Sequence, residues 1–127
     1  FDIHPKNKRE VGHRMCLQAL NKIYGFSVVS DAPRFSSAEI QNHSVLLRFK
    51  NAKNLRVNDD KINDLLLIVE NECVDFVFCV DGNSIMLSCD KIERNKKIEI
   101  KFAWSGFYNV NLYNEGDLPA FPFKICI

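Results

Sequence analysis

The sequence has 127 residues, of which 46% are hydrophobic and 26% are charged. This is the length of one domain and the composition of a globular protein, which excludes a largely disordered chain. The formal net charge of +1 provides no overall field for nucleic acid or an anionic membrane. The longest apolar run, residues 65–69, is too short to cross a bilayer. We therefore expect no nucleic-acid partner and no membrane span.

The first predicted element is an amphipathic helix between Pro5 and Gly25. Proline suits the first helical position, and glycine is typical of the residue that ends a helix. Gly12 in the interior costs about 1 kcal/mol relative to alanine, which a close backbone contact at that point would explain. The helical periodicity predicts one face packed against a neighbour. That apolar face comprises Val11, Met15, Cys16, Ala19, Leu20 and Ile23.

Beyond residue 32 the pattern changes to short strands and turns. The Asp81-Gly82-Asn83 segment is a hairpin signal between two apolar runs. Alternation in residues 98–104 predicts a strand with Trp104 on its inner face. The apolar tail, residues 118–123, contains two prolines and is expected to pack as extended chain over a surface. Strands are predicted at residues 34–40, 44–49, 54–57, 65–69, 75–80, 84–88, 98–104 and 109–112.

The spacing of these strands predicts a mainly β fold. It consists of an N-terminal helical segment, residues 1–31, followed by a β-sandwich, residues 32–127. Because the chain begins with Phe1 rather than Met, we expect it to be a fragment or a processed piece of a longer protein.

The five cysteines are an odd number and include no C-x-x-C pair. They are expected to be buried free thiols, because free cysteine packs as a small hydrophobic residue. The alternative is one disulfide among Cys73, Cys79 and Cys89. None of the three histidines sits at metal-ligand spacing, so we expect neither a metal nor another cofactor.

The candidate catalytic residues are Asp2 and His4, immediately before the predicted helix. A histidine beside a carboxylate is a common general base, since the carboxylate fixes the imidazole tautomer and stabilises its charged form. The alternative is an exposed capping pair. No phosphate-binding loop, serine nucleophile motif, zinc motif or calcium loop occurs.

Residues 2–15 carry a pattern in which Ile3-His4-Pro5 is followed by Asn7-Lys8 and then by Val11-Gly12-x-Arg14. This segment resembles the last sequence block of the sialate O-acetylesterase family, SGNH-type serine esterases that remove acetyl groups from sugars. The far end is similar to the closing signature of the same family. Its matching segments are 102–104, 111–113 and 118–123; residues 26–97 match only in their rhythm of strands and turns.

The resemblance implies that His4 acts as a general base toward a serine and then as a general acid toward the leaving sugar oxygen. SGNH enzymes usually place the acid three residues before the histidine, a position occupied here by Phe1. Three possibilities therefore stay open: Asp2 is the acid, Asp2 merely flanks His4, or the acid lies upstream.

The resemblance also implies a partner, the N-terminal part of the same precursor, which carries the nucleophilic serine and the oxyanion hole. Residues 1–31 would then be the last helix of the catalytic domain, and the isolated chain is expected to be inactive. Acetylated sialic acid is the favoured substrate, with acetylated xylan or other glycans as alternatives. The family suggests a secreted, lysosomal or periplasmic protein, while the odd cysteine count leaves the cytoplasm open.

Two rival functions come from other classes. One is a non-catalytic β-sandwich that binds carbohydrate or stabilises a partner chain, which an exposed aromatic platform would favour. We expect Trp104 and Tyr113 to be packed rather than to stack on a sugar. The other rival is a structural interaction domain, which requires a large apolar patch on the helix.

Overall fold

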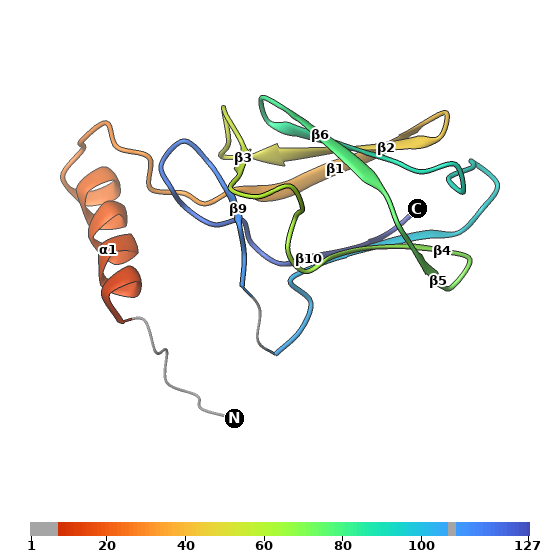
Figure 1. The fold of residues 1–127 in the computed structure, drawn as a ribbon. Helices are drawn as coiled ribbons and strands as arrows, with labels where there is room; N and C mark the ends of the chain where they lie inside the picture. Colours follow the sequence, from red (N-terminus) through yellow and green to blue (C-terminus); the bar gives the residue numbers. More distant parts are fainter. Residues whose placement is uncertain (1–7, 107–108) are drawn as a thin grey trace. The chain divides into compact units, whose positions relative to one another are not determined.

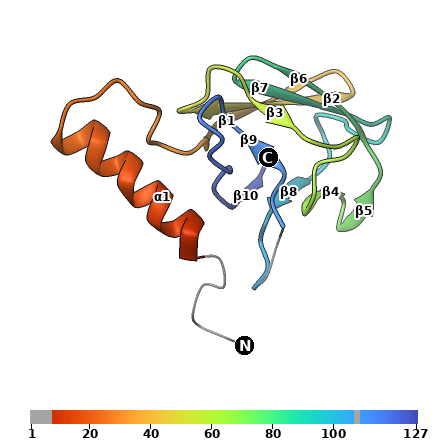
Figure 2. The ribbon, with the colours of Figure 1, turned by 60° about the vertical axis from the view of Figure 1, so that its left-hand side comes forward.

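The computed structural model describes residues 8–106 and 109–127 (Figures 1 and 2). The chain divides into two compact units, with the boundary between Asp31 and Ala32. The first unit is helical, and the second contains all of the described strands. The fold is mainly β: a helical segment is followed by antiparallel sheets in a sandwich-like arrangement, as predicted.

The first unit contains helix α1, Lys8–Gln18, which continues into a π-helical turn, Ala19–Ile23. Gly25 ends this helix, as predicted, with a left-handed φ of 72°. This turn allows the Phe26 N–H to donate to the Leu20 carbonyl at 2.9 Å. The predicted start at Pro5 lies outside the described residues.

The predicted apolar face of the helix is present but uncovered. No residue of α1 or of the π-helical turn is buried. Met15 is 69% exposed and Ile23 is 76% exposed, whereas Ala19 and Leu20 are half-buried. Gly12 has no close contact within the described part of the chain, since a Cβ built there meets nothing within 4 Å. The pattern therefore predicted the helix correctly, and the neighbour expected to cover its apolar face stays a prediction.

The second unit consists of two four-stranded antiparallel sheets and a short two-stranded ladder (Figures 1 and 2). The first sheet has the order β1-β2-β7-β6, formed by Arg34–Gln41, Ser44–Lys50, Ser84–Ser88 and Val77–Asp81. The second has the order β10-β8-β4-β5, formed by Phe123–Cys126, Ile98–Phe102, Leu65–Val69 and Glu72–Val74. The ladder pairs β3, Arg56–Val57, with β9, Leu112–Tyr113.

The core of this unit lies between the inner faces of the two sheets. Alternate residues of β2, β4, β7 and β8 are buried, which is the period expected of strands with one solvent face. Four phenylalanines close one part of this core. The Phe123 ring from the second sheet stacks on Phe35 at 4.9 Å and meets Phe49 edge-on at 5.8 Å, both in the first sheet. Phe102 lies 5.5 Å from the same ring.

The predicted hairpin at Asp81-Gly82-Asn83 is confirmed. Strands β6 and β7 pair in antiparallel register with Asp81 opposite Ser84, so the loop has two residues. Gly82 has a φ of 56°, in the left-handed region that a tight hairpin requires and that glycine adopts without strain.

Two strands were not predicted, and β3, β8 and β9 are shorter than predicted. Strand β5 has only three residues, and β10 follows the proline-rich tail that was expected to be simply extended. Pro122 limits β10 to the edge of its sheet, where it pairs with β8 alone. Strand β8 ends at Phe102, because Ala103 takes a left-handed φ of 51° and breaks the alternation before Trp104.

The prediction of buried thiols is wrong. Cys89 is half-buried, and the other four cysteines are exposed. They lie on the helix surface and on the outer faces of strands, where alternation turns them away from the core. All five are free, so the alternative of a disulfide among Cys73, Cys79 and Cys89 is also not found.

Two further features concern only the described residues. In residues 8–106 and 109–127, no group of three or more histidine, cysteine or acidic side chains has the geometry to hold a metal ion. None of the helices in these ranges has the length and apolarity needed to span a bilayer.

Candidate functional site

The predicted catalytic residues, Asp2 and His4, lie outside the described residues. The structure begins at Lys8, in the first turn of α1, so it describes the helix that follows this pair in sequence. The structure therefore shows the helix unit that follows the pair in sequence and, separately, the hollows of the sandwich.

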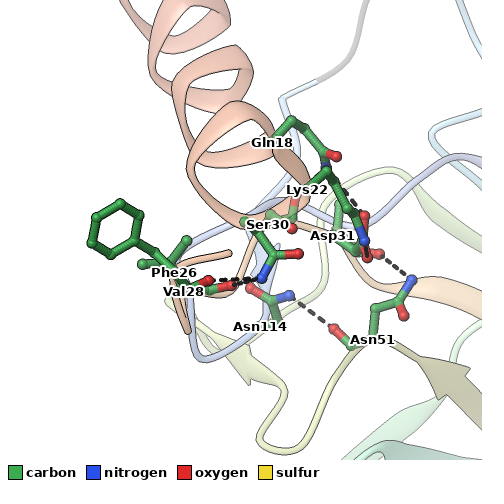
Figure 3. Close-up of polar contacts among 10 residues, drawn as sticks. Gln18, Lys22, Phe26, Val28, Ser30, Asp31, Asn51 and Asn114 are labelled. Carbon is green, nitrogen blue, oxygen red and sulfur yellow. Dashed lines mark hydrogen bonds and ion pairs between the residues drawn. The ribbon is translucent and has the colours of Figure 1, made fainter. Parts of the chain in front are cut away.

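Side chains on the last turns of the helix bind the segment that follows it (Figure 3). The Gln18 amide donates to the Ser30 carbonyl and, at 3.1 Å, to the Asp31 carboxylate. The Lys22 ammonium lies 2.9 Å from the other oxygen of Asp31. Ser30 is buried, whereas Lys22 and Asp31 remain substantially solvated. These contacts fold residues 26–31 back along the helix.

Asn21 supplies the second set of contacts in the same unit. Its side-chain amide donates to the carbonyls of Phe26, at 3.0 Å, and Val28, at 3.2 Å. Residues 26–31 are thus held by the polar side chains of the helix, and the large apolar side chains of the unit are left in solvent. The exposed large apolar residues of this unit are Val11, Met15, Ile23, Tyr24, Phe26 and Val29.

The closing sequence signature forms a structural turn in the second unit. Asn114 is fully buried, and its side-chain oxygen accepts the N–H groups of Gly116 at 3.0 Å and Leu118 at 3.1 Å. Its amide nitrogen donates to the Asn51 carbonyl at 2.8 Å (Figure 3). This buried asparagine thus binds three backbone groups, of which the Leu118 N–H is buried, and its role here is to hold a turn.

Asn111 has a similar role at the neighbouring loop. Its side-chain oxygen accepts the Asn63 N–H at 2.9 Å, and its amide donates to the Lys61 carbonyl at 2.8 Å. Tyr113 is half-buried as expected, and its hydroxyl donates to the Val110 carbonyl at 3.1 Å. Sequence reasoning did not identify either asparagine, although buried asparagines that bind backbone are common in turns.

The expectation that Trp104 is a core residue is wrong. Its side chain is 59% exposed and lines a hollow of about 420 Å³. The hollow is lined by Ala103, Trp104, Ser105, Gly106 and Pro122. This places an exposed indole on the surface of the sandwich.

A larger hollow, of about 540 Å³, lies at the β1–β2 turn and contains a histidine and two serines. His43 and Ser44 do not form a nucleophile–base pair there. The Ser44 hydroxyl bonds the Ser88 hydroxyl at 2.8 Å, and the His43 Nδ1 lies 3.0 Å from the Ile92 carbonyl. Since a carbonyl only accepts, Nδ1 carries the proton. This arrangement contains no activated serine of the kind that acyl transfer requires.

The structure is similar to part of a solved carbohydrate esterase. Over 98% of its length the chain matches XAC1771, a carbohydrate acetylesterase from Xanthomonas citri, with a TM-score of 0.79 and 28% sequence identity. The chain covers 29% of that protein. No protein-family model and no curated protein matches this sequence. The chain therefore resembles less than a third of a carbohydrate acetylesterase.

Proposed function

We propose that this chain is the histidine-bearing, C-terminal part of a carbohydrate O-acetylesterase. The observation that carries the proposal is the likeness to the Xanthomonas enzyme, which extends over nearly all of this chain at 28% identity. The Ile3-His4-Pro5 block at the start of the chain agrees with it, because that block resembles the segment that supplies the catalytic histidine in sialate O-acetylesterases.

The proposed chemistry is metal-free ester hydrolysis through an acetyl-serine. His4 takes the proton of a serine hydroxyl as the serine oxygen attacks the acetyl carbonyl, and the imidazolium then protonates the departing sugar oxygen. In the second half, His4 takes a proton from water, whose oxygen attacks the acetyl-serine. Acetate leaves and the serine recovers its proton from the imidazolium. Each proton that His4 accepts is thus returned within the same half-reaction.

Asp2 is the proposed carboxylate partner of His4. A carboxylate on the second imidazole nitrogen would hold the tautomer that accepts the serine proton. An acid upstream of Phe1 is the alternative, and the effects of substitution at position 2 distinguish the two.

The nucleophilic serine and the oxyanion donors would come from the N-terminal part of the same precursor. The helix unit offers a surface for that part, because its large apolar side chains are exposed. Covering such a side chain contributes roughly 1.5–3 kcal/mol. Acetylated sialic acid is the proposed substrate, with other acetylated glycans as alternatives.

The test uses the precursor encoded by the reading frame that includes this sequence. His4→Ala should lower kcat on an acetylated sugar at least ~10³-fold. His13→Ala, which changes an exposed histidine of α1, is the matched control and should leave kcat unchanged. A precursor that retains near-normal turnover after His4→Ala would refute the proposed role.

Two further measurements define the roles of Asp2 and of the missing serine. If Asp2 is the acid, Asp2→Asn should reduce kcat by a large factor, about 10⁴ in a well-studied serine enzyme; a small effect would assign the acid upstream. The isolated 127-residue chain should not hydrolyse 4-nitrophenyl acetate above the solvent rate. Turnover that a serine-directed phosphonate abolishes would contradict the need for an N-terminal part.

A further inference from the structure

The position of Trp104 depends on a left-handed alanine. By strand alternation Trp104 would follow Phe102 into the core, but Ala103 has a φ of 51° and redirects the chain. Ala103 is itself buried, and its N–H donates to the Asp64 carbonyl at 2.9 Å. A left-handed residue other than glycine costs about 1 kcal/mol or more. The fold thus accepts backbone strain at the point where a large apolar ring is placed in solvent.

A second exposed aromatic residue lies at the same end of the sandwich. Phe121 is 44% exposed, and its N–H donates to the Pro33 carbonyl at 2.9 Å. The Arg34 guanidinium carbon lies 4.5 Å from the centre of the Phe121 ring. In the antiparallel pair of β10 and β8, Phe123 lies opposite Phe102. The next position beyond this pair therefore places Pro122 beside Ala103.

The strand register also places a carboxylate at this end of the sandwich. Leu65 pairs with Phe102, which brings Asp64 opposite Ala103, and the Asp64 side chain is exposed. The Asp64 carboxylate accepts the Asn109 N–H at 3.2 Å through one of its two oxygens. The Asp64 carboxylate is a hydrogen-bond acceptor, and the Arg34 guanidinium is a set of hydrogen-bond donors. The Trp104 hollow of about 420 Å³ lies at the same end of the sandwich.

We infer that this end of the sandwich, formed by Trp104, Phe121 and Pro122, binds a pyranose ring of a glycan. A pyranose has apolar C–H faces and a rim of hydroxyl groups. An exposed indole suits the face, and the carboxylate and guanidinium suit the rim. The choice of a carbohydrate ligand rests on the proposed function, whereas the site itself rests on the exposure and arrangement of these residues.

A nucleic-acid base also stacks on aromatic rings, but such sites add a basic groove for the phosphates. With a formal net charge of +1 and a carboxylate beside the rings, this chain does not provide one. The competing occupant is the rest of the esterase, which would cover Trp104 with protein instead of sugar.

Tryptophan fluorescence tests the inference directly, because Trp104 is the only tryptophan in the chain. Xylohexaose and sialyllactose, titrated separately into the 127-residue chain, are the probes. At least one of them should cause a saturable blue shift of the emission and protect the indole from acrylamide quenching. Phe121→Ala should weaken that binding at least ~5-fold, equivalent to about 1 kcal/mol. Val77→Ala, at an exposed apolar residue on β6, should not change it.

Two results would overturn the inference. One is the absence of any saturable change with either oligosaccharide at millimolar concentration. The other is an indole already protected from acrylamide in the sugar-free precursor, measured as the difference between that protein and its Trp104→Phe variant. If either occurred while His4→Ala still abolished turnover, the proposed function would stand without this site. Saccharide binding together with turnover that is independent of His4 would mean that this binding site stands while the proposed catalytic role of His4 is wrong.

Discussion

Gln18 and Asp31 are joined by a hydrogen bond of 3.1 Å between the side-chain amide of one and the carboxylate of the other. Asp31 is the last residue of the helix unit, so this bond and the Lys22–Asp31 ion pair close the unit at its C-terminal end. Toward the N-terminal end of the helix the packing decreases: residues 17–21 are half-buried, whereas residues 8–16 are all exposed. Stability within the unit should therefore decline from the closed end toward Lys8.

Hydrogen exchange on the isolated chain should show this gradient. We expect fast exchange along α1 and slow exchange in β8, because opening is easiest where few apolar contacts are buried. Gln18→Ala should accelerate exchange in residues 26–31 and leave β8 unchanged, with the exposed Arg14→Ala as the control. Uniformly slow exchange in a dilute monomer would mean that the helix is packed on its own sandwich, and would remove the support for an external partner.

Gly12→Ala should stabilise the helix of the isolated chain by about 1 kcal/mol, since alanine has the higher helix propensity. A Cβ at this position meets no atom within 4 Å, so no clash offsets the gain. Far-UV circular dichroism should record the increase in helicity. A decrease in helicity would place another group against Gly12. In the precursor, a substantially smaller gain would identify Gly12 as part of the covered surface.

Asn114→Ala should destabilise the sandwich by about 1–3 kcal/mol, the cost of one unsatisfied buried group, because it removes the partner of three backbone groups of which one is buried. These are the N–H groups of Gly116 and Leu118 and the carbonyl of Asn51. Urea unfolding measures the effect, and Asn95→Ala at an exposed asparagine is the control. Equal midpoints for the two variants would contradict the structural role assigned to Asn114.

The stability of the sandwich should depend on pH through Glu115. Burial raises the pKa of this carboxyl group, but hydrogen bonds from the N–H groups of Glu115 itself, Lys53 and Asn54 outweigh burial and lower the pKa below its usual range. With a lowered folded-state pKa, the carboxylate stabilises the fold above its unfolded pKa. This stabilisation is lost as pH falls through the folded pKa.

Glu115→Gln should therefore reduce the stability lost as the pH falls below the unfolded pKa of glutamate and through the lowered folded pKa, because the amide does not titrate. It should also lower the stability at neutral pH, since a neutral oxygen accepts the Lys53 and Asn54 N–H groups less strongly. Thermal unfolding as a function of pH measures both effects. Glu72→Gln on β5 is the control, and an acid transition identical to that of the parent chain would refute the assignment.

The sequence predicted the sandwich because its signals are local. Alternation in residues 44–49 and 84–88 and the Gly82 turn each depend on neighbouring residues. The position of Trp104 was not predictable in the same way, since it depends on one backbone torsion at Ala103 and on the Asp64 carbonyl across the sheet. Strand β10 required knowledge of the edge that β8 leaves open.

The same difference between local signals and contacts of distant residues applies to the candidate site. The catalytic role of His4 was predicted from a sequence block and stays a prediction, since residues 1–7 are not described. The buried roles of Asn111 and Asn114 were missed, because nothing in a single sequence distinguishes an asparagine that holds a turn from one that faces solvent. Two of their partners lie far away along the chain: Lys61 is 50 residues from Asn111, and Asn51 is 63 residues from Asn114.

The free thiols of the second sheet have a consequence for how the molecule behaves when it is oxidised. Cys73 on β5 and Cys126 on β10 lie in one row across that sheet, with Ile68 and Glu99 between them. Three strand spacings of about 4.8 Å separate them, whereas a disulfide needs Cα atoms within about 7 Å. They cannot pair within one molecule. Each exposed thiol is available to another copy from opposite edges of the same sheet, so air oxidation through these two cysteines would link molecules to one another and would not form a bridge within one chain.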